Sequence, residues 1–224
     1  MITGAAFCPH PPALVPEVAR GAAPELADLR AAGRAAIQRV ATPGTTVLLL
    51  GAGPATRPHD ASARGTLAGY GVELQVGLTT GADGPTELPL SLTIGAWLVH
   101  DALDDVPALQ AWSIGPEPAS VELPDAPTAL VVMGDGSARR SLAAPGYLDE
   151  RAAGVDAGVA AALASGDPEA LRVDPSLGAD LLAAGPPVWH AAADLLAGRA
   201  WSAELLYDAA PYGVGYFAAA WTSG

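Results

Sequence analysis

Two histidines beside prolines are the first residues of this sequence that could do chemistry. His10 has a proline on either side, and His59 lies between Pro58 and Asp60. Proline fixes the backbone dihedral φ, so its neighbour is held in place for metal binding or proton transfer. Two histidines with one carboxylate are also a ligand set of non-haem Fe(II) enzymes. These segments therefore predict either an iron site or two structural turns, with Asp60 capping the element that follows it.

A second candidate group follows an apolar run at 128–133. Residues 134–137 read Gly-Asp-Gly-Ser, and two arginines follow at 139 and 140. Backbone N–H groups and the Ser137 hydroxyl could bind an anion there, with Arg139 supplying positive charge. The same segment is equally typical of a turn in which Asp135 or Ser137 caps the next element. Asp135 and Ser137 are the candidate catalytic residues, and Arg139 and Tyr212, from the aromatic tail, are candidates for a substrate pocket.

Length and composition restrict the class of protein. The chain has 224 residues, a formal charge of −13 and 50% hydrophobic residues, which fits one globular domain over 1–224. An acidic chain with no basic cluster longer than residues 139–140 is not expected to bind nucleic acid. Its apolar stretches are shorter than the roughly 20 residues that span a bilayer, so no membrane partner is expected either. One cysteine excludes an internal disulfide, and we expect a cytoplasmic location.

The elements that must position these residues alternate between strand and helix. We expect strands at 2–7, 45–50, 72–78, 112–114, 128–133, 201–207 and 212–221, and helices at 26–40, 89–100, 149–164, 175–184 and 187–196. This order predicts an α/β fold with a central, mostly parallel sheet covered by helices on both faces. Ligands of such sheets bind at the carboxyl ends of the strands. Segments 8–12, 51–60 and 134–140 converge there if their strands are parallel.

Four segments carry a family resemblance. They are Phe-Cys-Pro-His-Pro-Pro-Ala-Leu-Val-Pro-Glu at 7–17, Leu-Gly-Ala-Gly-Pro at 50–54, Gly-Asp-Gly-Ser-Ala-Arg-Arg at 134–140 and Ala-Pro-Tyr-Gly-Val-Gly-Tyr at 210–216. The sequence resembles the catalytic subunits of the class III extradiol ring-cleavage dioxygenases, whose fold the Memo-type proteins share. It is most similar to an uncharacterised actinobacterial branch of that superfamily. The resemblance covers essentially the whole chain and implies the extradiol dioxygenase fold.

The resemblance implies an Fe(II) site and also shows where this sequence departs from one. In active members, iron is held by a histidine that matches His10, by a histidine after the second strand and by a glutamate near the C-terminus. The second position here is Ala55, with His59 four residues further on. The acid/base histidine of the family falls on Ala138, and the third ligand falls near 183–185, where the residues are Ala-Ala-Gly. A single imidazole does not hold a divalent ion.

Three functional hypotheses remain open. The first is an oxidoreductase whose Fe(II), held by His10, His59 and a carboxylate from position 60, 135 or 204, acts on an aromatic or catechol-like molecule. The second is a non-catalytic descendant, without a metal, that binds a small molecule or a protein partner in the same pocket. The third is metal-independent chemistry at His10, Asp135 and Ser137. The resemblance also implies a homo-oligomer.

Overall fold

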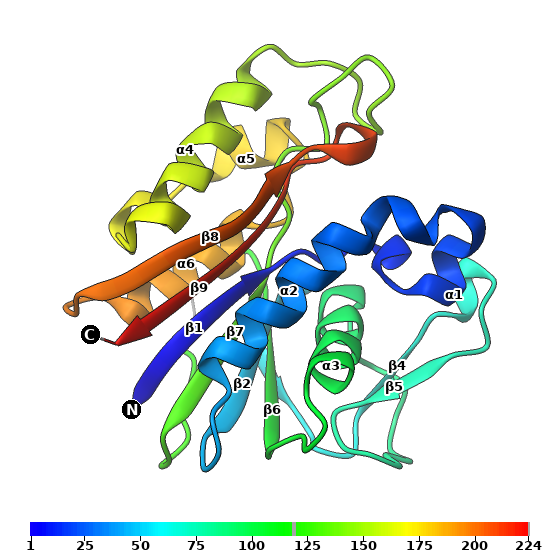
Figure 1. The fold of residues 1–224 in the computed structure, drawn as a ribbon, viewed down its shortest axis with the longest axis vertical. Coiled ribbons are helices and arrows are strands. Elements are labelled where there is room, and N and C mark those ends of the chain that lie inside the picture. The colour runs from blue at the N-terminus through cyan, green and yellow to red at the C-terminus, as the bar shows by residue number, and fades with distance from the viewer. Residues whose placement is uncertain (118–119, 224) are drawn as a thin grey trace.

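A seven-stranded sheet forms the centre of this α/β protein in a computed structural model that describes residues 1–117 and 120–223 (Figure 1). The strands run in the order β3-β6-β2-β7-β1-β9-β8. They are β1 (Ile2–Cys8), β2 (Thr46–Ala52), β3 (Arg57–His59), β6 (Leu109–Ile114), β7 (Thr128–Met133), β8 (Trp201–Ala209) and β9 (Tyr216–Ser223). The four central strands β6, β2, β7 and β1 are parallel, and β3, β9 and β8 pair antiparallel. The predicted, mostly parallel α/β sheet is confirmed.

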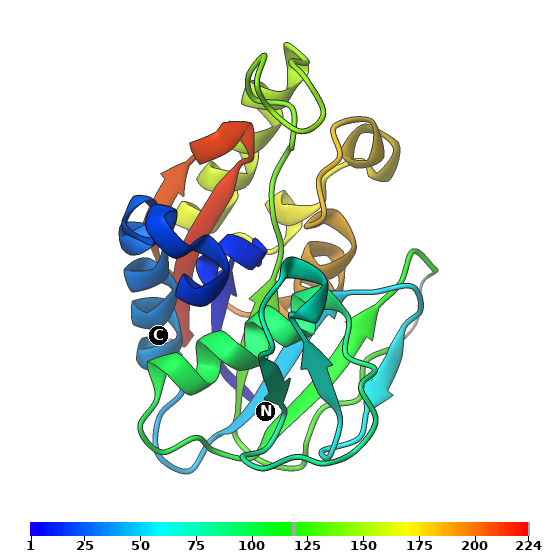
Figure 2. The same cartoon turned by 90° about the vertical axis from the view of Figure 1, so that its right-hand side faces the viewer.

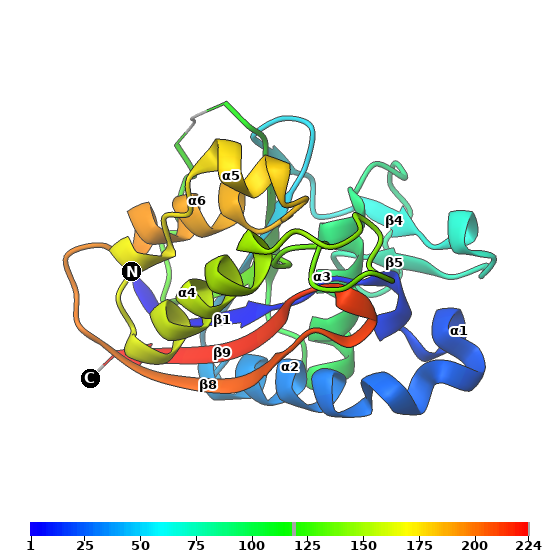
Figure 3. The ribbon, with the colours of Figure 1, turned by 90° about the horizontal axis from the view of Figure 1, so that it is seen from above.

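Helices cover both faces of the sheet. The helices α2 (Ala27–Val40) and α3 (Leu90–Ala102) pack on one face, and α4 (Arg151–Ser165) and α6 (Pro186–Leu196) pack on the other (Figure 3). The short helices α1 (Pro16–Ala19) and α5 (Pro175–Asp180) lie near the carboxyl ends of the strands (Figure 1). A two-stranded sheet of β4 (Arg64–Thr66) and β5 (Gln75–Gly77) contacts α3 (Figure 2). None of the described helices is long and apolar enough to cross a membrane.

Burial on both faces explains the continuous apolar sequence of the central strands. All six residues of β7 are buried, and so are five of the seven residues of β2. Small residues in β1 let helix α2 come close. A Cβ atom on Gly4 would lie 3.0 Å from the side chain of Val40 and 2.9 Å from the carbonyl oxygen of Trp221. Glycine at position 4 is therefore required by packing.

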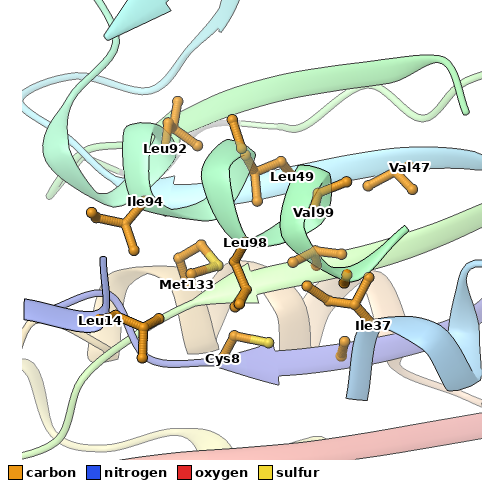
Figure 4. Close-up of a cluster of buried hydrophobic side chains, with 14 of the residues drawn as sticks. Cys8, Leu14, Ile37, Val47, Leu49, Leu92, Ile94, Leu98, Val99 and Met133 are labelled. Atoms are coloured by element: carbon orange, nitrogen blue, oxygen red, sulfur yellow. The ribbon is translucent and has the colours of Figure 1, made fainter. Parts of the chain in front are cut away.

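The core on the α2–α3 face contains the single cysteine. Cys8 lies among Ile37, Leu49, Leu98 and Met133 (Figure 4), and each of these side chains is at most 1% exposed. Burial raises the pKa of the Cys8 thiol to about 12. A thiol with so high a pKa is almost entirely protonated at neutral pH and is a poor nucleophile. Cys8 is therefore a core residue.

The structure differs from the sequence prediction at several places, and the predicted strand at 212–221 begins only at Tyr216. Residues 57–59 form the edge strand β3, whereas the sequence predicts a loop. The predicted strand at 72–78 is shorter, and as β5 it belongs to the separate small sheet. The predicted helix at 175–184 ends at Asp180, because Leu182 adopts a left-handed backbone with φ of +53°. Helical residues have negative φ, so the helix cannot continue through this position.

Candidate functional site

The carboxyl ends of β1 and β7 bring His10 and Asp135 together. Cys8 is the register partner of Met133, and the chain continues by two residues on both strands to His10 and Asp135. The backbone N–H of His10 donates a 2.8 Å hydrogen bond to Oδ1 of Asp135. The imidazole Nδ1 lies 3.5 Å from the same carboxylate oxygen. The predicted convergence of segments 8–12 and 134–140 is therefore present.

Both members of this pair are largely withdrawn from water. His10 is 8% exposed, and its Nδ1 atom is buried. The 3.5 Å contact of Nδ1 with Asp135 is longer than an ordinary hydrogen bond. Burial raises the pKa of the Asp135 carboxyl, whereas the charge and the backbone N–H of His10 act in the opposite direction. The pair is thus an imidazole with a carboxylate beside its Nδ1 side.

A third residue, Tyr216, joins this pair from β9. Phe7 of β1 pairs with Ala219 of β9, so the same antiparallel register places His10 at the level of Tyr216. Tyr216 is 5% exposed, and its pKa is raised first by burial and then by the negative charge of Asp135. The sequence indicates Tyr216 only as a member of an aromatic tail. Tyr216 is identified only by the antiparallel pairing of β9 with β1, which brings it to the level of His10.

Ser137 has a structural role in this structure. The residue is fully buried, and its hydroxyl donates a 3.0 Å hydrogen bond to the carbonyl of Leu181. The same oxygen accepts a 3.0 Å hydrogen bond from the backbone N–H of Arg139. Because the hydroxyl is held inside the protein by two hydrogen bonds, the geometry does not present Ser137 to a substrate. Of the two predicted catalytic residues, only Asp135 lies beside another reactive group.

Arg139 and Tyr212 lie on the loops around the carboxyl edge. The Nε atom of Arg139 is buried and has no hydrogen-bond partner among residues 1–117 and 120–223. Tyr212 is 47% exposed and donates a 2.7 Å hydrogen bond from its hydroxyl to Glu25. Neither residue is among those that line the two cavities described for this fold. Both residues therefore lie at the carboxyl edge, and their part in a substrate pocket stays a prediction.

His59 belongs to a separate buried cluster. Its side chain is 1% exposed, Nε2 lies 3.1 Å from Oγ of Ser113, and Nδ1 lies 3.4 Å from the carboxylate of Glu87. Ser113 donates its own proton to the carbonyl of Ala55 at 2.8 Å, so His59 Nε2–H donates to Ser113. Burial, and next the charge of Arg57, lower the pKa of His59, while Glu87 partly opposes them.

The two histidines do not form one iron site. His59 is on β3 and His10 follows β1, and these strands are four intervals apart, about 19 Å at the usual strand spacing. Among the described residues, no three His, Cys, Asp or Glu side chains could hold one metal ion together.

The carboxylates considered as third ligands are also engaged elsewhere. Asp60 accepts hydrogen bonds from Ser62, and Glu204 pairs with Arg39. The remaining candidate, Asp135, lies at His10, but it follows β7, which is three strand intervals from β3. The predicted iron site of His10, His59 and a carboxylate therefore does not fit this structure.

A large cavity opens on the α6 face of the sheet. Its volume is about 830 Å³, and it lies between the end of β6 at Ile114 and the helices α5 and α6, which contribute Ala179, Ala191 and Leu195 among others. Ala183, Pro186 and Pro187 line the cavity, and between them the N–H of Gly185 donates a 2.8 Å hydrogen bond to the carbonyl of Asp135. The cavity is therefore adjacent to the carboxyl edge, where α/β sheets bind ligands. The sequence does not predict this cavity, because segments distant in the sequence form its walls.

Comparison of the chain with known protein families and with curated proteins finds no relative. The chain matches no known family model, and no curated protein is significantly similar to it. What the structure establishes is the class: an α/β protein with a mostly parallel sheet and a His-Asp pair at its carboxyl edge. The extradiol dioxygenase resemblance, the cytoplasmic location and the homo-oligomer stay predictions.

Proposed function

We propose that this protein binds a small organic molecule in the 830 Å³ cavity between β6, α5 and α6, without a metal ion. The observation that carries the proposal is the cavity itself. Its volume falls in the range of natural ligand sites, which are mostly apolar and contain a few polar groups. Its walls combine Ala179, Ala191 and Leu195 with a few polar side chains such as Thr56 and His190.

The charges around the cavity favour a neutral ligand. Arg172 is already paired with Glu169 at 2.8 Å and with Asp194 at 2.7 Å. His190 uses Nε2 in a 2.8 Å contact with the carbonyl of Val173. The carboxylate-bearing Glu117 also lines the wall, and the whole chain carries a formal charge of −13. An anionic ligand would be repelled, and the mostly apolar walls favour an uncharged molecule over a cation, so we infer an apolar, uncharged ligand.

A neutral fluorescent probe tests this proposal. We expect N-phenyl-1-naphthylamine to bind the purified protein saturably, with a rise in emission. Ala191→Trp puts an indole into the cavity and is expected to weaken binding at least tenfold. Ala153→Trp, on the exposed surface of α4, is the matched control and is expected to bind as the wild type does. No binding by the wild-type protein, or equal binding by both variants, would overturn the proposal.

A further inference from the structure

The four histidines of this chain differ in how their Nε2 atoms are used. Three of these atoms contact protein groups within hydrogen-bonding distance: His59 with Ser113 (3.1 Å), His100 with the carbonyl of Gly77 (3.0 Å) and His190 with the carbonyl of Val173 (2.8 Å). Within the described part of the chain, Nδ1 of His10 is buried and has no hydrogen-bond partner. Nε2 of the same ring does not belong to this class of buried, unpartnered atoms. No hydrogen bond from His10 Nε2 to a described residue is present either. His10 therefore keeps Nε2 in contact with solvent, unlike the other three.

The carboxylate of Asp135 faces the opposite side of the same ring. Its Oδ1 atom is fixed by the backbone N–H of His10 at 2.8 Å and lies 3.5 Å from Nδ1. A carboxylate at this position favours the tautomer with its proton on Nδ1, which leaves a lone pair on Nε2. It also stabilises the imidazolium that forms when Nε2 accepts a proton. This arrangement gives a base without any metal ion.

We propose that His10 Nε2 accepts a hydrogen bond and a proton from the O–H or N–H group of a neutral small molecule at the carboxyl ends of β1, β7 and β9. The proton moves from the donor atom of the ligand to Nε2, and the electron pair of the broken bond stays on that donor atom. Asp135 acts as a positioning residue. The proton returns to the ligand, or passes to water, when the ligand leaves.

The charge and packing of the site set the class of ligand. Asp135 and the formal charge of −13 disfavour a ligand that arrives as an anion, whereas an anion formed by the transfer lies beside the imidazolium of His10. Tyr216, which is 5% exposed, packs with Cys8 in the core on the α2–α3 face. The cavity of the proposed function opens on the α6 face, and its lining includes none of His10, Asp135 or Tyr216. The two sites are separate, so the failure of one proposal leaves the other standing.

Chemical modification tests the accessibility of Nε2. Diethyl pyrocarbonate reacts with accessible, unprotonated imidazole nitrogens, and peptide mass mapping reports each histidine separately. We expect His10 to react at least tenfold faster than His59, whose Nε2 contacts Ser113 and whose Nδ1 is buried. Long-range proton–nitrogen NMR is expected to show His10 with its proton on Nδ1 in the wild type. Equal reaction rates for His10 and His59, or a proton on Nε2 of His10, would overturn the proposal.

A coloured donor tests the proton transfer. In weakly acidic buffer, 4-nitrophenol is largely neutral, and its conversion to the yellow phenolate is visible by absorbance. We expect wild-type protein to raise the phenolate fraction saturably, His10→Gln to abolish the rise and Asp135→Asn to reduce it at least tenfold. His100→Gln is the matched control and is expected to behave as the wild type. 4-Nitroanisole, which lacks the O–H group, should compete weakly or not at all.

Two results would refute the proton transfer. The first is an unchanged phenolate fraction with wild-type protein. The second is an equal loss in His10→Gln and His100→Gln, with both variants folded by circular dichroism. If His10→Gln fails to fold, the modification rates and the tautomer of the wild-type protein still decide the question.

Discussion

Asp156, on helix α4, accepts a 2.9 Å hydrogen bond from the backbone N–H of Ser137. It also forms a 2.8 Å ion pair with Arg140, although Asp156 itself is only 1% exposed. A Cβ atom on Gly215 would lie 2.2 Å from the carboxylate of Asp156, so glycine is needed for this approach. Helix α4 thereby fixes the loop that carries Asp135.

Replacing Asp156 should destabilise the protein strongly. Asp156→Ala leaves Arg140 and the N–H of Ser137 without their buried partner, and breaking a buried pair costs about 3 kcal/mol or more. The free energy of unfolding from urea denaturation measures the loss. Asp180→Ala, which removes an exposed partner of Arg151, is the control and should cost far less. Similar losses in the two variants would show that Asp156 does not fix the loop.

Gly185 is expected to tolerate no side chain. A Cβ atom there would lie 2.1 Å from the ring of Trp189, which is 2% exposed and cannot easily move. Gly185→Ala should therefore lower the free energy of unfolding by about 2 kcal/mol through overpacking. Gly154→Ala, on the exposed side of α4 with nothing within 4 Å of its Cβ, should raise it by about 0.5–1 kcal/mol. Thermal unfolding of both variants should shift in opposite directions.

Two neighbouring leucines should respond oppositely to glycine. Leu182 has φ of +53° and is 50% exposed, whereas Leu181 is fully buried. Leu182→Gly relieves a left-handed backbone and is expected to leave stability unchanged or to raise it by up to about 1 kcal/mol. Leu181→Gly removes a core side chain and should cost about 3 kcal/mol or more. A large loss in Leu182→Gly, measured by chemical denaturation, would contradict the strain argument.

His59 should make stability depend on pH below neutrality. Burial and the charge of Arg57 lower its pKa from 6.5, so the folded protein binds this proton less readily than the unfolded chain. The contribution to stability is therefore full above pH 6.5 and decreases as the pH falls below 6.5. His59→Gln should remove this part of the pH dependence of the unfolding free energy. Glu87→Gln should steepen it, because Glu87 is the group that raises the pKa of His59.

The His59→Gln and Glu87→Gln variants together show whether His59 or another titrating group causes the pH dependence of stability. If wild-type protein and His59→Gln lose stability equally between neutral and mildly acidic pH, a different group is responsible. If Glu87→Gln instead makes the unfolding free energy less dependent on pH, then Glu87 lowers the pKa of His59, contrary to the inference from the structure.

The sequence by itself determined the central strands and the covering helices. The apolar run of β7 occupies Thr128–Met133, as predicted, because a strand buried on both faces must be apolar at every position. Helix α2 follows the apolar positions from Leu29 to Val40. The convergence of His10 with Asp135 was also foreseeable, since parallel strands end at the same edge of the sheet.

The tertiary structure alone decided which other reactive residues lie beside His10 and Asp135. His59 was expected at the site of His10, but strand order places it on the opposite edge, beyond β6, β2 and β7. Tyr216 reaches the site because β9 returns antiparallel along β1. Hydrophobic periodicity reports how each segment is buried, and it does not encode the order in which distant strands pair. For that reason the sequence predicts that His10 and Asp135 converge, and only the assembled sheet separates His59 from them and adds Tyr216.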